Sequence, residues 1–163
     1  MKVKLFIHMN NSQKYKTAEI DADLKVGQLV KEFAPSQAEN KDFLEDVEIY
    51  LEDQDDDLDK GISISDANIK NGDHIFVGRC KKVSVNILYA GKSFSTSVSP
   101  ATSIKKLRKL ALKHFEIDDI SGADLLLWIN KEPLDNRQLI GSLTDYPSCG
   151  VSLVLATKND ING

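Results

Sequence analysis

The clearest structural signal in the chain is the stretch Val83-Ser84-Val85-Asn86-Ile87-Leu88-Tyr89-Ala90-Gly91-Lys92-Ser93-Phe94-Ser95-Thr96-Ser97-Val98. On both sides of Gly91, apolar residues largely alternate with polar ones. A period of two is typical of a strand that buries one face, and a glycine between two such strands favours a tight turn. The stretch therefore predicts a β-hairpin.

An amphipathic helix is predicted directly after this hairpin. Ser103 is a favourable N-cap residue, and apolar residues follow it at the spacing of one helical face. The apolar positions are Ile104, Leu107, Leu110, Ala111 and Phe115, and the basic positions between them are Lys105, Lys106, Arg108, Lys109 and Lys113. We interpret the basic side as the solvated face of the helix.

Two further strands are predicted in this half of the chain. The first covers residues 124–129 and ends in the turn at 130–133, and the second covers residues 151–155 after a turn-rich stretch. The order is strand, strand, helix, strand, irregular segment, strand. A lone hairpin cannot bury its apolar side, so the helix must lie across the sheet.

The first half repeats this order. Residues 2–7 return as residues 82–87, and residues 65–67 return as residues 144–146, an offset of about 80 residues that indicates tandem domains. We predict an α+β protein with domains at 1–79 and 80–157 and a flexible tail at 158–163. Each domain is expected to have a mixed sheet of four to five strands with one helix across it. Because the linker at 78–82 is short, the domains should lie close together.

Composition narrows the classes of function. The chain has 163 residues and 41% hydrophobic content, and no apolar run approaches the ~20 residues of a membrane span. Without a signal peptide the expected location is the cytoplasm, where both cysteines, Cys80 and Cys149, should be free thiols. Residues 1–80 carry ten basic and seventeen acidic residues, and residues 81–163 carry eleven and eight. This charge predicts no nucleic-acid partner.

Signals for catalysis or metal binding are weak. His8, His74 and His114 are scattered singly, and the chain has no nucleotide-binding glycine motif. The acidic stretch at 53–59 begins like a calcium loop, but Leu58 replaces the glycine and Ile64 the closing glutamate that such a loop needs. We interpret this stretch as a solvated turn. We expect no enzyme, metal or cofactor.

The sequence resembles ubiquitin in both halves. Residues 64–77 resemble the stretch that leads into ubiquitin's last strand, and residues 85–104, 125–134 and 142–155 resemble its hairpin and helix start, its third strand and its final strand. The tandem arrangement resembles the interferon-induced two-domain ubiquitin-like modifier and the bacterial tandem modifiers of Bil-type antiphage operons. The resemblance implies two β-grasp domains.

The resemblance also implies chemistry at the chain end. An E1-like activating enzyme would adenylate the Gly163 carboxylate and form a thioester, an E2-like conjugating enzyme would pass it to a target protein, and a deconjugating protease would reverse the reaction. Glycine lacks Cβ and can thread a narrow channel. The residues expected to contact the activating enzyme are Lys158, Asn159, Asp160, Ile161 and Asn162. Asn162 departs from the family, which usually has a second glycine there.

Three alternatives remain at this stage. The β-grasp units could form a noncovalent interaction scaffold, and the tail could become the thiocarboxylate of a sulfur carrier. The tandem arrangement and Asn162 count against the sulfur carrier, which usually is a single unit with paired terminal glycines. The terminal Gly163 could also be only a frayed end.

A second candidate site is a surface on the outer face of the second sheet. By alternation, Leu126 and Trp128 lie on the side opposite Leu125, Leu127 and Ile129, and Val154 and Ala156 join them on the last strand. In ubiquitin an apolar patch on the equivalent face is the usual docking site. We predict that Leu126, Trp128, Val154 and Ala156 bind a partner, the alternative being that Leu126 and Trp128 pack against the first domain.

Overall fold

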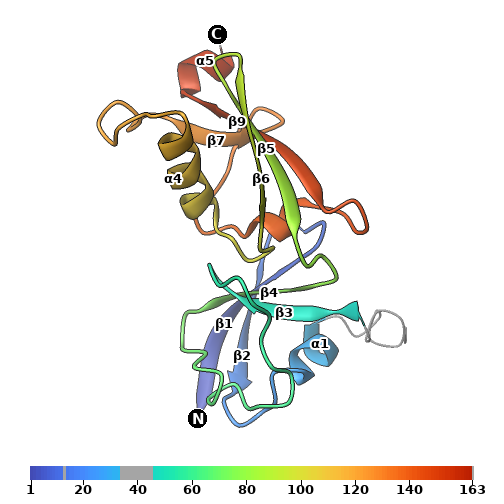
Figure 1. The fold of residues 1–163 in the computed structure, drawn as a ribbon. Coiled ribbons are helices and arrows are strands. Elements are labelled where there is room, and N and C mark those ends of the chain that lie inside the picture. The colour runs from blue at the N-terminus through green and yellow to red at the C-terminus, as the bar shows by residue number, and fades with distance from the viewer. Residues whose placement is uncertain (13, 34–45, 163) are drawn as a thin grey trace.

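The structure, a computed structural model, describes residues 1–12, 14–33 and 46–162 and contains two sheets (Figure 1). The first has the order β2-β1-β4-β3, with β1 Lys2–Met9, β2 Lys16–Asp21, β3 Glu48–Leu51 and β4 His74–Gly78. The second has the order β6-β5-β9-β7-β8, with β5 Val83–Tyr89, β6 Lys92–Val98, β7 Leu126–Ile129, β8 Glu132–Pro133 and β9 Gly150–Ala156.

Both sheets combine an N-terminal hairpin with a parallel pairing to the last strand of their unit. β1 pairs antiparallel with β2 and parallel with β4, and β5 pairs antiparallel with β6 and parallel with β9. The helices are α1 Gln28–Phe33, α4 Ile104–His114 and α5 Lys158–Asn162, with the 3-10 helix η1 at Ile140–Leu143. This topology confirms two tandem β-grasp domains. Within the described ranges, no helix has the length and apolar character needed to cross a membrane.

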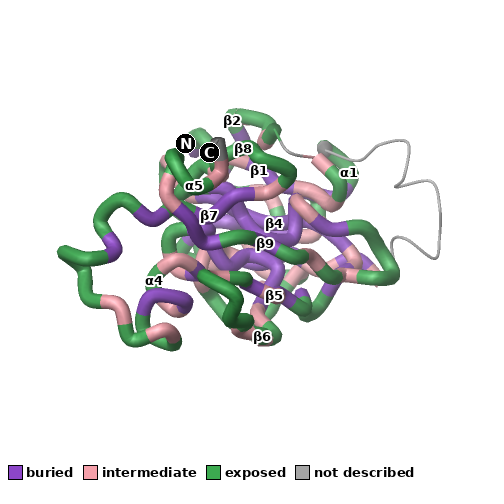
Figure 2. Tube along the Cα trace, turned by 90° about the horizontal axis from the view of Figure 1, so that it is seen from above, coloured by how far each residue is buried: buried purple, intermediate pink, exposed green. Residues whose placement is uncertain are grey.

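Each sheet buries its own core. In the second domain Ile104, Leu107 and Ala111 of α4 pack with Val85 of β5 and Leu153 of β9. The predicted helix start is confirmed, because the Ser103 Oγ accepts a hydrogen bond from the Lys106 amide at 3.2 Å. The first domain has a separate core between its sheet and α1. Figure 2 shows the buried residues as a band through the two sheets.

A third apolar cluster joins the two domains. Tyr50 and Phe76 of the first domain pack with Ala101 and Leu139 of the second, and Phe76 is completely buried. A Cβ on Gly141 of η1 would lie 2.6 Å from the Phe76 ring, a separation that real contacts do not show. The second domain therefore approaches Phe76 so closely that only glycine fits at this point.

Polar contacts surround this cluster. The Asn10 Nδ2 donates to the Gly141 carbonyl and the Thr144 hydroxyl, both at 3.2 Å, and the Asn11 amide donates to the Thr144 carbonyl at 2.9 Å. Asp53 accepts hydrogen bonds from the Ser103 amide at 2.8 Å and the Ser103 hydroxyl at 3.1 Å. A carboxylate of the first domain thus stands at the N-terminus of α4, where the helix dipole favours negative charge.

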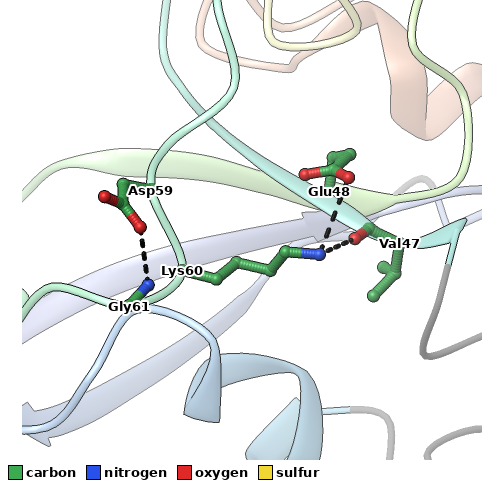
Figure 3. A network of polar contacts seen from close by, with 5 residues as sticks. All are labelled: Val47, Glu48, Asp59, Lys60 and Gly61. Carbon is green, nitrogen blue, oxygen red and sulfur yellow. Dashed lines mark hydrogen bonds and ion pairs between the residues drawn. The ribbon is translucent and has the colours of Figure 1, made fainter.

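Lys60, the residue directly after the acidic stretch, contacts the start of β3 (Figure 3). The Lys60 ammonium donates to the Val47 carbonyl at 2.9 Å and lies 3.6 Å from the Glu48 carboxylate. The Asp59 carboxylate accepts from the Gly61 amide at 2.8 Å, as in an Asx turn. Asp53 and Asp59 therefore have structural partners, and Asp53 contributes to the domain interface.

The expectation of free thiols is wrong. Cys80 and Cys149 form a disulfide with a Cα–Cα distance of 5.7 Å. The parallel register pairs Ser84 of β5 with Gly150 of β9, so the residue before β9 lies beside the linker. Because the two cysteines are 69 residues apart with one in each sequence repeat, their spacing alone gave no sign of this contact.

We expect the domain interface to contribute strongly to stability. Phe76→Ala should lower the free energy of unfolding by about 3–5 kcal/mol, because it leaves a cavity between the domains. Gly141→Ala should cost about 1–3 kcal/mol by overpacking the same site from the other domain. Denaturant unfolding followed by circular dichroism measures both. Gly150→Ala, whose Cβ would meet nothing closer than 3.6 Å, is the control, and an equal loss in all three variants would contradict a special role for this interface.

Candidate functional site

The tail begins where β9 ends. Residues 158–162, which belong to the predicted flexible tail, form the helical turn α5. The Thr157 hydroxyl accepts a hydrogen bond from the Asp160 amide at 3.2 Å and thereby caps the turn, which places Asp160 at its positive end. Since an isolated helix this short is marginal in water, the segment can be drawn out at little cost.

The residues expected to contact an activating enzyme lie on this turn. Lys158, Asn159 and Asp160 are exposed and Ile161 is partly exposed. Asn162 is the last residue of α5, and Gly163 lies outside the described residues. The described tail therefore offers a polar, accessible surface directly behind the last strand.

The predicted patch is partly open and partly closed. Leu126 and Val154 are 38% and 36% exposed, whereas Trp128 and Ala156 are buried. Leu88, which was not predicted as a site residue, is 44% exposed, and both Leu88 and Trp128 pair with Val154 across the sheet. We define the open face as Leu88, Leu126 and Val154. Alternation along β5 would have identified Leu88, because it shares a face with Ser84 and Asn86.

Trp128 forms the buried floor beside this open face. It is 4% exposed, and its Nε1 donates to the Ala156 carbonyl at 2.9 Å, within its own domain. This bond spans from β7 to the last residue of β9, directly before Thr157 and α5. Trp128 therefore fixes the point from which the tail leaves the sheet.

The same face of the first domain is closed. In the first sheet, Phe76 of β4 pairs with His8 of β1 on one side and with Tyr50 of β3 on the other. In the second sheet, Val154 of β9 pairs in the same way with Leu88 of β5 and Trp128 of β7. The two rows of three residues therefore occupy equivalent positions. All three residues of the first row are less than 5% exposed. Ala101 and Leu139 of the second domain pack on Phe76 and Tyr50. The tandem thus has two equivalent faces, of which the second domain covers one.

A histidine pair lies at the closed face. The His8 Nε2 lies 2.8 Å from the His74 Nδ1, both side chains are buried, and Phe6 stacks on His74 with ring centroids 4.6 Å apart. The sequence suggested single, scattered histidines, but parallel pairing of β1 with β4 brings these two together. One ring donates and the other accepts, so the accepting ring must be neutral, and protonation of both rings would break the contact.

Burial disfavours protonation of the pair. Burial first, and the neighbouring His74 second, lower the pKa of His8 to about 3. Burial is also the largest cause that lowers the pKa of His74, followed by Arg137, while Asp135 and Asp73 oppose the shift. Both rings are therefore uncharged at neutral pH.

The histidine pair predicts that acid destabilises the protein. The folded pKa of His8 lies below the unfolded value of 6.5, so its contribution is complete above pH 6.5 and is lost as the pH falls toward 3. One such proton lowers the free energy of unfolding by up to about 1.4 kcal/mol per pH unit. Urea unfolding between pH 7.5 and 5 should show this slope. His8→Gln should reduce the slope and the exposed His114→Gln should not, and equal slopes in both would refute the assignment.

Trp128 should be required for stability. Trp128→Ala should lower the free energy of unfolding by about 3–5 kcal/mol, and Trp128→Phe by about 1–3 kcal/mol because the buried Ala156 carbonyl loses its donor. Leu126→Ala on the open face should cost only about 0.5 kcal/mol. Unfolding followed by circular dichroism tests this order. A melting curve that Trp128→Ala leaves unmoved would mean that the indole serves only to bind a partner.

Comparison with known proteins identifies the second domain. Residues 84–158 match the family model of BilA ubiquitin-like domain 2, a range that runs from β5 to the first residue of α5. No curated protein matches the chain. Among solved structures, ubiquitin of Caldiarchaeum subterraneum aligns with 17% identity and a TM-score of 0.39 over 47% of this chain and 92% of its own.

The family match, together with the repeated topology, decides the assignment. The matched range contains the open face, Trp128 and the start of the tail. The first domain repeats the strand order of the second around a parallel central pair. Residues 84–158 are therefore similar to BilA ubiquitin-like domain 2, and the chain consists of two ubiquitin-like β-grasp domains in tandem.

Proposed function

We propose that the chain is a protein modifier that is activated at the Gly163 carboxylate and conjugated to target proteins. An E1-like enzyme would adenylate the carboxylate with ATP and carry it as a thioester, and an E2-like enzyme would pass it to an amine of the target. A deconjugating protease would release it. The chain is then the substrate of these enzymes and not a catalyst.

The position of the open face next to the tail is the observation that carries this proposal. Leu126 pairs with Ala156, the last residue of β9, and Trp128 bonds to the carbonyl of Ala156. An enzyme that docks on the open face therefore lies beside the start of the tail. Docking near a reacting group raises its effective concentration, which would favour reaction at the Gly163 carboxylate.

We further propose that the protein acts in the cytoplasm and in antiphage defence. Adenylation consumes ATP, which the cytoplasm supplies. The family match to a BilA ubiquitin-like domain supports a role of the Bil type. The noncovalent scaffold remains the second candidate, because an open apolar face can bind partners without any reaction at the chain end.

Incubation with ATP and the cognate activating enzyme tests the proposal. The wild type should support ATP–pyrophosphate exchange and form a thioester with the enzyme. A chain that lacks Gly163 should still bind but should form neither, because the reacting carboxylate is displaced. The double variant Leu126→Ser and Val154→Ser should keep its terminus but bind about tenfold more weakly.

The outcomes separate the candidate functions. If the activating enzyme binds the open face but forms no adenylate with the chain, the result supports the noncovalent scaffold and rejects the protein modifier. A terminal thiocarboxylate found by mass spectrometry would instead identify a sulfur carrier. Equal thioester formation by the wild type and by the chain without Gly163 would also overturn the proposal.

A further inference from the structure

A cleft opens onto the disulfide between the linker and the turn before β9. Its volume is about 420 Å³, and both cysteines line it together with Arg79, Lys81 and Lys82. Arg79 pairs with Asp46 at 3.0 Å and lies over the Tyr146 ring at 4.0 Å, whereas Lys81 and Lys82 are exposed. The cleft therefore combines a disulfide with a positively charged wall.

The two sulfur atoms differ in their surroundings. Cys80 is 1% exposed, whereas Cys149 is partly exposed and lies at the cleft. Cys149 also has a φ of 48°, in the left-handed region that residues with a Cβ rarely adopt. Access from solvent thus favours attack at the sulfur of Cys149.

Two polar groups lie near the Cys80 sulfur, which is the atom that would leave as a thiolate. The Asn10 Nδ2 donates to it at 3.3 Å, and the Thr144 hydroxyl lies 3.7 Å away. Arg79, Lys81 and Lys82 line the same cleft, and their positive charges oppose the effect of burial, which disfavours a thiolate at Cys80. A stabilised leaving thiolate accelerates exchange.

We propose that this cleft is a thiol–disulfide exchange site for small anionic thiols. The thiolate of the small molecule attacks the Cys149 sulfur and forms a new S–S bond, while the Cys80–Cys149 bond breaks and its electron pair stays on the Cys80 sulfur. The products are a mixed disulfide at Cys149 and a thiolate at Cys80. Attack of this thiolate on the mixed disulfide reverses the step and releases the small thiol.

Exchange at this site removes the covalent link between the linker and the turn before β9. The disulfide connects the linker to the turn before β9, and Asn10 of the first domain is hydrogen-bonded to its buried sulfur. Once the bond opens, the linker is held by these noncovalent contacts alone. This consequence does not depend on activation at Gly163.

Three small thiols of similar size and different charge provide the test. Protein purified without reductant is treated with 3-mercaptopropionate, 2-mercaptoethanol or cysteamine at equal thiolate concentration. Intact mass follows the rate, and peptide mapping locates the adduct. We expect the adduct on Cys149 and a rate about three- to tenfold higher for the anionic than for the cationic thiol, with the difference shrinking in 0.5 M salt.

Charge variants show whether the cleft causes this preference. Lys81→Ala with Lys82→Ala should remove most of the difference between the thiols, whereas Lys105→Ala with Lys106→Ala on α4 should preserve it. Equal rates for the three thiols, an adduct on Cys80, or protein that lacks the disulfide would each overturn the proposal. Loss of activation at Gly163 would not affect any of these readouts.

Discussion

The burial of Phe76 between the domains is the constraint on which the rest of the structure depends. Its ring lies in a row with His8 and Tyr50 on the outer face of the first sheet, and Gly141 of the second domain comes close enough to exclude a Cβ. An outer sheet face with this much apolar surface would be costly in water. The second domain covers it, and the two domains are thereby held as a pair.

This packing makes the two repeats unequal. The closed face of the first domain contains the neutral histidine pair and is in contact with the second domain. The matching row in the second domain carries Leu88 and Val154, which remain accessible. Of the two equivalent faces, the one that stays open belongs to the domain that also bears the tail.

The tail and the open face are coupled through Trp128. Its indole is buried and bonds to the last residue of β9, so the exit of the tail is fixed relative to the open face. Beyond that point the capped turn α5 is short, and little free energy holds it in helical form. A fixed origin with an easily extended segment behind it fits the proposed activation at the terminal carboxylate.

The sequence by itself determined two repeated units of sheet and helix, the strand alternation and the Ser103 helix start, because these depend on periods of two and 3.6 residues along the chain. The resemblance to ubiquitin, and not the periodicity, predicted that each unit is a β-grasp domain. Tertiary structure decided the Cys80–Cys149 disulfide, the His8–His74 pair and the burial of Trp128. Cys80 and Cys149 are separated by 69 residues, and His8 and His74 by 66. Such contacts arise from strand register and domain packing, which local periodicity does not specify.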